Sequence, residues 1–396
     1  MRPGTRPGGR LGGGARVPLA LRNLLANKRR LIRSSAGIGF AVLLMLVQLG
    51  FEQGFFTASL AMVRQIDGDL IVQSATKYQF HSRDPFAAAD ISRAEKVAGI
   101  ASVVPLYGSW FDMEWQPPGG TQTYLVQTLA FDPDHPPLLS SEIRAESGKL
   151  KQADAVIVDR RARPFLGMAD AKGDAEINGH TVHVVGSFGI GPDFQSDGSV
   201  MMSAETFARL LPGNQAPVAP LPVEFGVVKL KAGEDPARVQ AALRQALGSD
   251  VRVLTKSQFV ELERAFQAEM SSAGPIFWMG TVVGFVVGLL ISYQIIYTDL
   301  SDQLPQYATL KGIGYNNAYL VRVVLGQATL SALAGYIPAW LLCLVVYRII
   351  GSVALLPLHM TLWLTLLSLA LTVGMCLFSA LLAIRRVIAA DPAEVF

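Results

Sequence analysis

Four long stretches without a charged residue constrain this chain more than any other feature of its sequence. Each contains at least 18 residues, and they are Ser34–Phe51, Gly274–Thr298, Val323–Tyr347 and Met360–Ile384. At about 1.5 Å per residue, helices of this length cross a hydrocarbon core about 30 Å thick. Because that core offers no water to the backbone, the stretches are predicted to be membrane-spanning helices.

The composition favours membrane spans over the buried helices of a large soluble enzyme. Charged residues make up only 16% of the chain and hydrophobic residues 51%, whereas soluble proteins contain about 25% charged residues. The two cysteines, Cys343 and Cys376, lie inside predicted spans. They are therefore expected to be packing residues and not a disulfide.

Basic residues at the N-terminus predict the orientation of the spans. Residues 1–33 hold nine basic residues and no acidic one, which favours a cytoplasmic N-terminus. Four spans then return the C-terminus to the cytoplasm, in agreement with Arg385 and Arg386, whereas Arg348 lies on the outer side against the rule. The first span is too long for the apolar region of a cleaved signal peptide.

This reasoning predicts an all-α bundle of four spans with a large α+β extracytoplasmic domain inserted between spans one and two. The expected segments, in order, are a disordered basic tail (1–16), an amphipathic interfacial helix (17–33), span one (34–63), the α+β domain (64–270), span two (271–298), a cytoplasmic coupling helix or loop (299–319), span three (320–348), a short outer loop (349–358), span four (359–385) and a cytoplasmic tail (386–396).

The segment before span one is expected to contact the membrane surface. Apolar residues such as Leu21 and Leu24 can face the acyl chains while Arg22 and Lys28 meet anionic head groups. A nucleic-acid-binding tail is the alternative, and membrane lipids are the favoured partner. Glu52, near the outer end of span one, is either a functional intramembrane acid or an interfacial residue in water.

Strand-like and helical patterns alternate in the inserted domain, which indicates an α+β fold. Helices are expected to begin after Asp235 and at Thr255, where Gln258 completes a capping box, and the second should lead directly into span two. The predicted strands are Asp69–Gln73, Ser102–Leu106, Thr123–Phe131, Ala155–Asp159, Thr181–Phe188, Glu224–Lys231 and Asp250–Leu254.

Small residues in span two predict close helix packing. Gly280, Gly284 and Gly288 recur every four residues, and such a ridge lets a second helix approach closely. Pro338 is expected to kink span three.

The sequence contains little that could perform catalysis. It has no phosphate-binding loop of the G-x-x-x-x-G-K-[ST] type, so ATP hydrolysis is not expected here. The glycines of Gly186–Gly191 predict a turn and not a nucleotide site. His180 and His183 are three apart, which on a strand places them on opposite faces, and Asp132, Asp134 and His135 form an equally weak candidate for a metal site. We therefore expect no cofactor, no metal and no enzyme activity in this chain, and an energy source in a partner.

The segment after span two carries a recognisable motif. Tyr293–Asp302 (YQIIYTDLSD), followed by Gln306–Tyr315 (QYATLKGIGY), resembles the signature of DevC-type permeases, which belong to the FtsX-like, MacB-like group of ABC transporters. The C-terminal Asp391–Glu394 (DPAE) is similar to the end of the wider group. Gln306 stands where the family usually has an acidic residue.

The resemblance implies a permease subunit of an ABC exporter in the bacterial inner membrane. Two copies would pair with two copies of a DevA-like ATPase that binds ATP and Mg²⁺, together with a DevB-like membrane fusion protein and a TolC-like outer-membrane channel. The residues that would contact the ATPase are Asp299, Asp302, Gln303, Gln306, Tyr307, Leu310, Lys311 and Gly312.

Two other functions use the same layout. An FtsX-like regulator would activate a periplasmic cell-wall hydrolase without moving a solute, and a membrane-anchored receptor would bind a ligand with the outer domain. The predicted docking segment argues against a receptor, which has no need of an ATPase contact. The sequence does not select a substrate.

Overall fold

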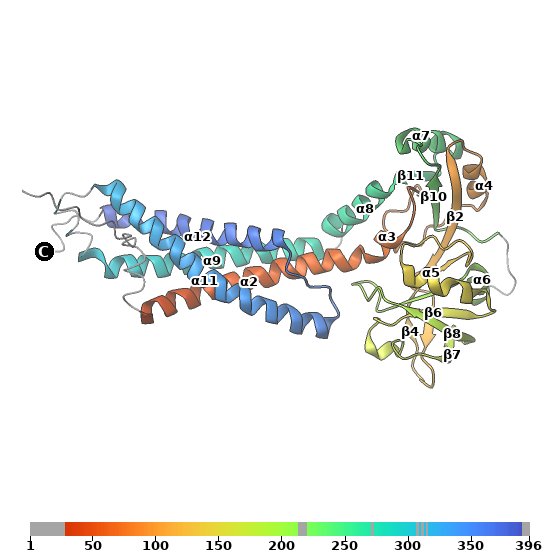
Figure 1. The fold of residues 1–396 in the computed structure, drawn as a ribbon, viewed down its shortest axis with the longest axis horizontal. Coiled ribbons are helices and arrows are strands. Elements are labelled where there is room, and N and C mark those ends of the chain that lie inside the picture. The colour runs from red at the N-terminus through yellow and green to blue at the C-terminus, as the bar shows by residue number, and fades with distance from the viewer. Residues whose placement is uncertain are drawn as a thin grey trace, which may run out of the picture. The chain divides into compact units, whose positions relative to one another are not determined.

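The computed structural model describes residues 28–389 except 213–219, 271–272, 306–308, 310–312 and 314–315. The chain divides into two compact units. The helical unit comprises Met1–Leu49, Gly280–Val346 and Met360–Phe396, and the large unit comprises Gly50–Met279 and Tyr347–His359. The longest elements are the helices α2 (Lys28–Ser59), α9 (Ala273–Asp302), α11 (Asn317–Ala354) and α12 (Leu362–Ala389) (Figure 1).

Four helices in the described part of the chain are long and apolar enough to cross a membrane, which confirms that the four predicted spans are helical. They cover Ser34–Ser59, Gly274–Asp302, Asn317–Ala354 and Leu362–Arg385. The helices extend beyond the uncharged runs because a charged residue ends a hydrophobic stretch without ending a helix. α11, for example, passes Arg348 and ends at Ala354.

The ends of the first helix differ from the expected segments. Residues 28–33 continue directly into the span as part of α2, with no turn between a surface helix and span one. Residues 1–27, which hold the expected tail and most of the interfacial helix, lie outside the described residues. α2 ends at Ser59, and Leu60 separates it from the short α3 (Ala61–Gln65).

The large unit is built on a mixed sheet of 11 strands in the order β11-β1-β10-β2-β5-β9-β6-β8-β7-β3-β4. β2 joins the two halves of the sheet, since it pairs antiparallel with β10 and then with β5. Parallel pairing occurs between β5 and β9 and between β6 and β8. The strands are β1 (Leu70–Ser74), β2 (Ile100–Ser109), β3 (Glu114–Gln116), β4 (Tyr124–Leu125), β5 (Gln127–Phe131), β6 (Ala155–Asp159), β7 (Gly173–Ile177), β8 (His180–Phe188), β9 (Ser199–Ser203), β10 (Phe225–Leu230) and β11 (Val251–Thr255).

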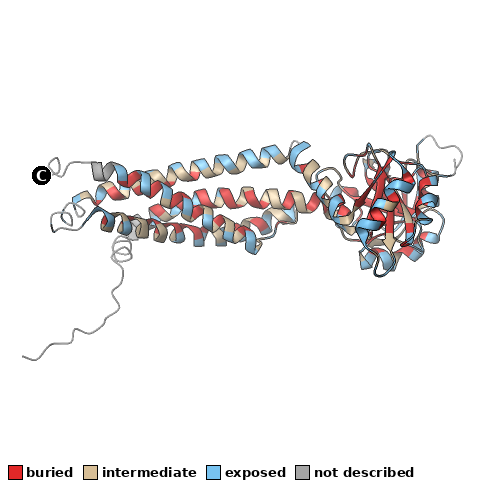
Figure 2. Cartoon of the chain, turned by 90° about the horizontal axis from the view of Figure 1, so that it is seen from above, coloured by how far each residue is buried: buried red, intermediate tan, exposed pale blue. Residues whose placement is uncertain are grey.

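The seven predicted strands cover eight of the eleven observed ones, because the predicted strand Thr123–Phe131 is interrupted at Val126 and forms β4 and β5, and three others were missed. Missed β3 and β7 are short or largely polar, and β9 carries polar residues at both ends, so none shows a clear apolar alternation. β6 is buried at all five positions, whereas β7 has only two buried residues. Most strands of the sheet are buried in Figure 2.

Helices cover the sheet, and their starts follow ordinary capping rules. α4 (Ala89–Glu95) and α7 (Pro236–Leu247) pack against each other and against β2 and β11, respectively (Figure 1). The remaining helices are α5 (Ser141–Ser147), α6 (Ala204–Leu210) and α8 (Lys256–Ala265), with 3-10 turns at Gly148–Lys151 and Pro164–Leu166. The predicted caps are confirmed, because Asp235 caps α7 and Thr255 forms a capping box with Gln258.

α8 continues into a π-helical turn, Phe266–Met270. Residues 271 and 272 lie outside the described residues, and so does the predicted direct passage from α8 into span two. The α8 side chains nearest the core, Phe259 and Glu263, are buried. α8 is therefore anchored to the large unit immediately before the second span.

Candidate functional site

The segment between α9 and α11 is the predicted coupling site. α9 continues past Thr298 to Asp302. Thr309 Oγ1 then donates a hydrogen bond to the Pro305 carbonyl at 2.9 Å, and the Ile313 amide donates to the Thr309 carbonyl at 3.1 Å. Both bonds have the four-residue spacing of helical structure. The described positions are thus compatible with the short helix expected in this segment.

The structure describes three of the eight predicted contact residues. Asp302 is exposed, Asp299 is partly buried, and Gln303 is only 4% exposed. Gln303 is therefore poorly placed to meet a partner and better placed to hold the end of α9. Ile313, which the sequence reasoning did not single out, is 71% exposed and offers an apolar contact. The other five predicted residues lie outside the described residues: Gln306, Tyr307, Leu310, Lys311 and Gly312.

The three glycines of α9 have different surroundings. A Cβ at Gly280 would lie 2.5 Å from Gln48 Nε2 of α2, and a Cβ at Gly288 would lie 3.0 Å from Met375 Sδ of α12. A Cβ at Gly284 would meet no described atom within 4 Å. Two of the three predicted packing glycines therefore serve contacts within this chain, and the third faces open space.

α9 is the least covered of the four spans. Only 6% of its most apolar window is buried, compared with 33–44% in the other three helices. Large apolar side chains such as Val283 and Val286 are about half exposed beside Gly284. In a bilayer this face contacts lipid or another helix.

Neutral hydrogen bonds join α12 to its neighbours. Ser379 Oγ donates to the Leu289 carbonyl of α9 at 3.1 Å, and Tyr336 OH of α11 donates to the Thr365 carbonyl at 2.8 Å. Cys343 and Cys376 are free thiols and buried, in agreement with the packing role expected for them. Small polar side chains of this kind stabilise helix contacts in membranes.

Lys256 connects the chain leaving span one to the chain approaching span two. Its ammonium donates to the carbonyls of Val63 and Ile66, both at 2.6 Å. Val63 lies in α3, after the first span, and Lys256 begins α8, before the second. The lysine thus adds a strong donor to two carbonyls at the C-terminal end of α3, where the Val63 carbonyl also accepts a hydrogen bond from the Ile66 amide at 3.4 Å. Burial lowers the pKa of Lys256 from 10.5 to about 8. We call these contacts the Lys256 clamp.

Other contacts fix both sides of the Lys256 clamp to the sheet. Asp67, which follows α3, accepts a hydrogen bond from Lys229 of β10 at 2.5 Å. On the α8 side, Glu263 accepts a hydrogen bond from the Phe80 amide at 2.7 Å. The Phe259 ring meets the Phe225 ring edge-on, with centroids 5.5 Å apart. The clamp is therefore tied to the sheet of the large unit on both sides.

A buried ion pair lies in the core of the large unit. Lys77 Nζ is 2.6 Å from Glu224 Oε2, and the two side chains are 0% and 4% exposed. The ammonium also lies 4.8 Å and 4.7 Å from the ring centroids of Trp110 and Phe225. Burial raises the pKa of Glu224 and lowers that of Lys77, while their mutual attraction opposes both shifts.

The weak metal candidates are exposed surface pairs. His183 Nδ1 lies 2.7 Å from Asp174 Oδ1, and His135 Nδ1 lies 3.1 Å from Asp132 Oδ2. Among the described residues, no group of three or more His, Cys, Asp or Glu side chains could hold a metal ion. The predicted turn over Gly186–Gly191 is wrong, because residues 186–188 belong to β8 and residues 189–191 follow it as irregular chain, with Gly191 at φ +98°.

Two family models match the chain. A model described as MacB-like periplasmic core domain matches residues 34–246, more than half of the chain, and one described as FtsX-like permease C-terminal matches residues 278–392. A search of curated proteins finds no match.

Two solved structures are similar to part of the chain. The extracellular domain of the noncanonic ABC-type transporter YknZ from Gram-positive bacteria has 11% identity and a TM-score of 0.32, covering 48% of this chain and 99% of that domain. A domain of a putative permease protein from Porphyromonas gingivalis has 13% identity and a TM-score of 0.29, covering 47% of this chain and 89% of that one.

Proposed function

Because the chain belongs to the family of FtsX-like and MacB-like permeases of ABC transporters, we propose that it is the membrane subunit of an exporter driven by a separate ATPase. ATP and Mg²⁺ bind to that ATPase, and this chain is not itself an enzyme. The chain transmits motion from the ATPase to the large unit. The four spans serve as levers and do not enclose a substrate tunnel.

The Lys256 clamp is the observation that carries this proposal. It joins the residues after span one to the residues before span two, within 2.6 Å of both carbonyls. Since α8 and the chain after α3 are also fixed to the sheet, a displacement of these two spans would move the large unit as one body. A domain joined to the spans by flexible linkers would not follow such a displacement.

The segment 299–319 is the proposed contact with the ATPase. Asp302 and Ile313 are exposed there and offer one charged and one apolar group. This assignment places the segment and both chain termini in the cytoplasm and the large unit in the periplasm. The chain would then be a multi-pass protein of a bacterial inner membrane.

The proposed assembly contains two copies of this chain, two DevA-like ATPase subunits, a DevB-like membrane fusion protein and a TolC-like outer-membrane channel. The open face of α9 at Gly284 supports pairing of two copies, because a Cβ there meets nothing within 4 Å in the described chain. An FtsX-like regulator would use the same clamp and coupling segment. It would differ in activating a cell-wall hydrolase without a fusion protein or solute movement.

Replacing Ile313 with Asp tests the coupling assignment. The chain is reconstituted in nanodiscs with its ATPase, and ATP hydrolysis is compared with and without the permease. We expect Ile313→Asp to reduce the stimulation at least about tenfold, since a buried carboxylate without a partner costs several kcal/mol. Leu139→Asp, at an exposed leucine of the large unit, is the matched control and should stimulate normally.

Equal stimulation by Ile313→Asp and the wild type would refute the contact at this segment. Solute transport measured in the same vesicles separates the exporter from the regulator. A complex that hydrolyses ATP normally and activates a cell-wall hydrolase, yet moves no solute with its fusion protein present, would favour the regulator.

A further inference from the structure

A cavity of about 850 Å³ lies in the large unit, beside the residues that link it to three spans. One wall is the end of α2 and the start of α3, including Ala58 and Ala61. A second wall comes from the link between α11 and α12, including Leu355 and Leu356. Since these residues directly follow or precede apolar spans, chain connectivity places the cavity where the polypeptide leaves the membrane.

The link between α11 and α12 is firmly placed against α2. A Cβ at Gly54 would lie 2.6 Å from Leu358 Cδ2, so the leucine side chain packs directly against the α2 backbone. Leu355 adopts φ +56°, a left-handed conformation that costs a non-glycine residue about 1 kcal/mol or more. A leucine held in this conformation indicates that the surrounding contacts determine the path of the link.

The opposite wall carries the basic residues. Arg160 and Arg161 follow β6, and Ile190 and Gly191 follow β8. Both loops are held by Asp159, whose buried carboxylate accepts hydrogen bonds from the amides of Arg161 at 2.9 Å, Gly191 at 2.7 Å and Ile190 at 3.3 Å. The two loops are therefore fixed relative to each other.

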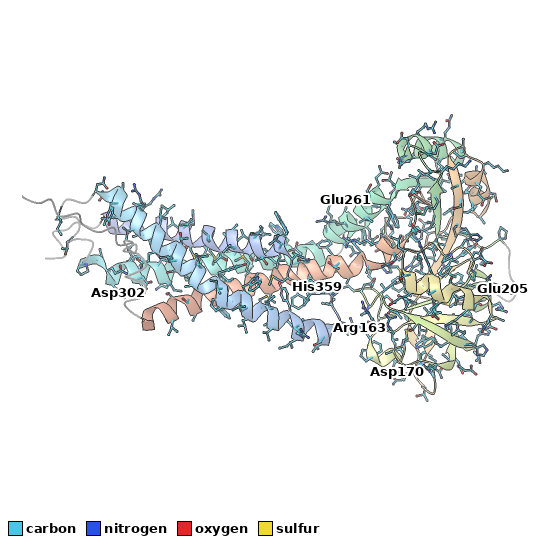
Figure 3. The ribbon with its side chains drawn as sticks, viewed as in Figure 1. Arg163, Asp170, Glu205, Glu261, Asp302 and His359 are labelled. Atoms are coloured by element: carbon cyan, nitrogen blue, oxygen red, sulfur yellow. The ribbon has the colours of Figure 1, made fainter. Side chains whose placement is uncertain are left out.

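The two arginines differ in how closely a carboxylate pairs with their charge. Arg160 makes two hydrogen bonds to Glu142, at 2.9 Å and 2.7 Å, and its charge is balanced there. Arg161 is exposed and makes no ion pair within 4 Å among the described residues, although the carboxylates of Asp159 and Glu142 are near enough to attract its charge. The other titratable side chains of the lining are Asp170 and His359, both labelled in Figure 3. Arg161 is thus the cation most open to a ligand.

We propose that this cavity holds a membrane phospholipid, with its phosphate beside Arg161 and the start of an acyl chain along the apolar wall formed by Ala58, Leu355 and Leu356. A guanidinium binds phosphate oxygens well, and the apolar wall would be unnecessary for a small soluble anion. The cavity volume falls in the range of ordinary ligand sites. Lipid binding at this site requires only the spans and the cavity, and it does not depend on ATP-driven export.

Native mass spectrometry of the full chain in detergent tests the proposal. Phosphatidylglycerol is titrated against the wild type, Arg161→Glu and Lys231→Glu, the last being a matched charge reversal at an exposed lysine outside the cavity. We expect the wild type and Lys231→Glu to retain the lipid equally. Arg161→Glu should bind about tenfold or more weakly, because the charge reversal both removes an attractive cation and adds a repulsive anion beside the phosphate. Ala169→Trp, which fills the cavity from an exposed position, should weaken binding without changing charge.

Two comparison ligands separate a lipid site from an anion site. Digalactosyldiacylglycerol has the same tails without phosphate and should bind at least about tenfold more weakly. Glycerol 3-phosphate should not displace the lipid. Equal retention by Arg161→Glu and wild type, or displacement by glycerol 3-phosphate alone, would overturn the proposal.

Discussion

Each of the two units of this molecule is stabilised internally by a different kind of contact. In the helical unit, α9 approaches α2 and α12 through Gly280 and Gly288, and Ser379 adds a neutral hydrogen bond. In the large unit, the Lys77–Glu224 pair and the Lys256 clamp fix charged groups inside the core. Small residues let helices pack closely without a directional contact, whereas a buried charge is destabilising unless its particular partner stays in place.

This difference agrees with the proposal that the spans move and that they carry the large unit as one body. The difference between the contacts of the two units can be tested by substitution. Substitutions in the large unit should change its stability. Substitutions on the exposed face of the helical unit should change assembly and leave the fold of the single chain intact.

Breaking the buried pair should have the largest effect. Lys77→Met leaves the Glu224 carboxylate buried without its partner, which costs about 3–5 kcal/mol. Chemical unfolding of the full chain, followed by fluorescence of the adjacent Trp110, measures the loss. The double variant Lys77→Met with Glu224→Leu should recover most of the stability, since no unpaired charge remains. If the single variant unfolded like the wild type, the large unit would not depend on this pair.

Substitutions at the glycines of α9 should have an intermediate effect on stability. The effect should differ between Gly284 and Gly288, which lie one turn apart on the same helix. Gly288→Leu places a side chain against Met375 and should destabilise the bundle by about 1–3 kcal/mol. A Cβ at Gly284 meets no described atom within 4 Å, so for Gly284→Leu we expect no change in the thermal unfolding of the single chain.

Association of two copies is measured on the same two variants by single-molecule photobleaching in nanodiscs. Gly284→Leu should reduce the paired fraction if α9 lies at the proposed dimer interface. Unchanged pairing would show that the open face of α9 contacts lipid. The comparison with Gly288→Leu separates loss of pairing from loss of folding.

The features predicted from the sequence are those encoded in short windows. The spans follow from uninterrupted apolar runs, the strand Ala155–Asp159 from a short apolar run, and the start of α8 from the capping box at Thr255. Each of these depends on neighbours within one element. β7 was missed because it is exposed at three of five positions and lacks a strong pattern.

The Lys256 clamp and the Lys77–Glu224 pair were not predicted for the opposite reason. Lys256 meets Ile66 across 190 positions, and Lys77 meets Glu224 across 147. No local pattern distinguishes these lysines from exposed ones, because their partners come together only in the folded sheet. The coupling motif was found by resemblance, and the structure adds only that Gln303 is buried while Asp302 and Ile313 are exposed.

The pH dependence of the Lys256 clamp should give the smallest effect and test how rigid the large unit is at its junction with the spans. In the unfolded chain Lys256 keeps its proton up to about pH 10.5, but burial lowers its pKa to about 8 in the folded chain. Between these values the unfolded chain binds more protons, so the contribution of Lys256 to stability rises with pH and is constant below pH 8.

Unfolding midpoints of the wild type and Lys256→Met, measured at intervals from pH 7 to pH 10, isolate this contribution because all other titrating groups are shared. The wild type should be the more stable at every pH, since Lys256→Met removes the hydrogen bonds to Val63 and Ile66. Its advantage should widen above pH 8. Parallel curves would mean that Lys256 titrates as an ordinary surface lysine. The junction would then be looser than the rest of the large unit. In that case α3 and α8 would not belong to the part of the large unit that is proposed to move as one body.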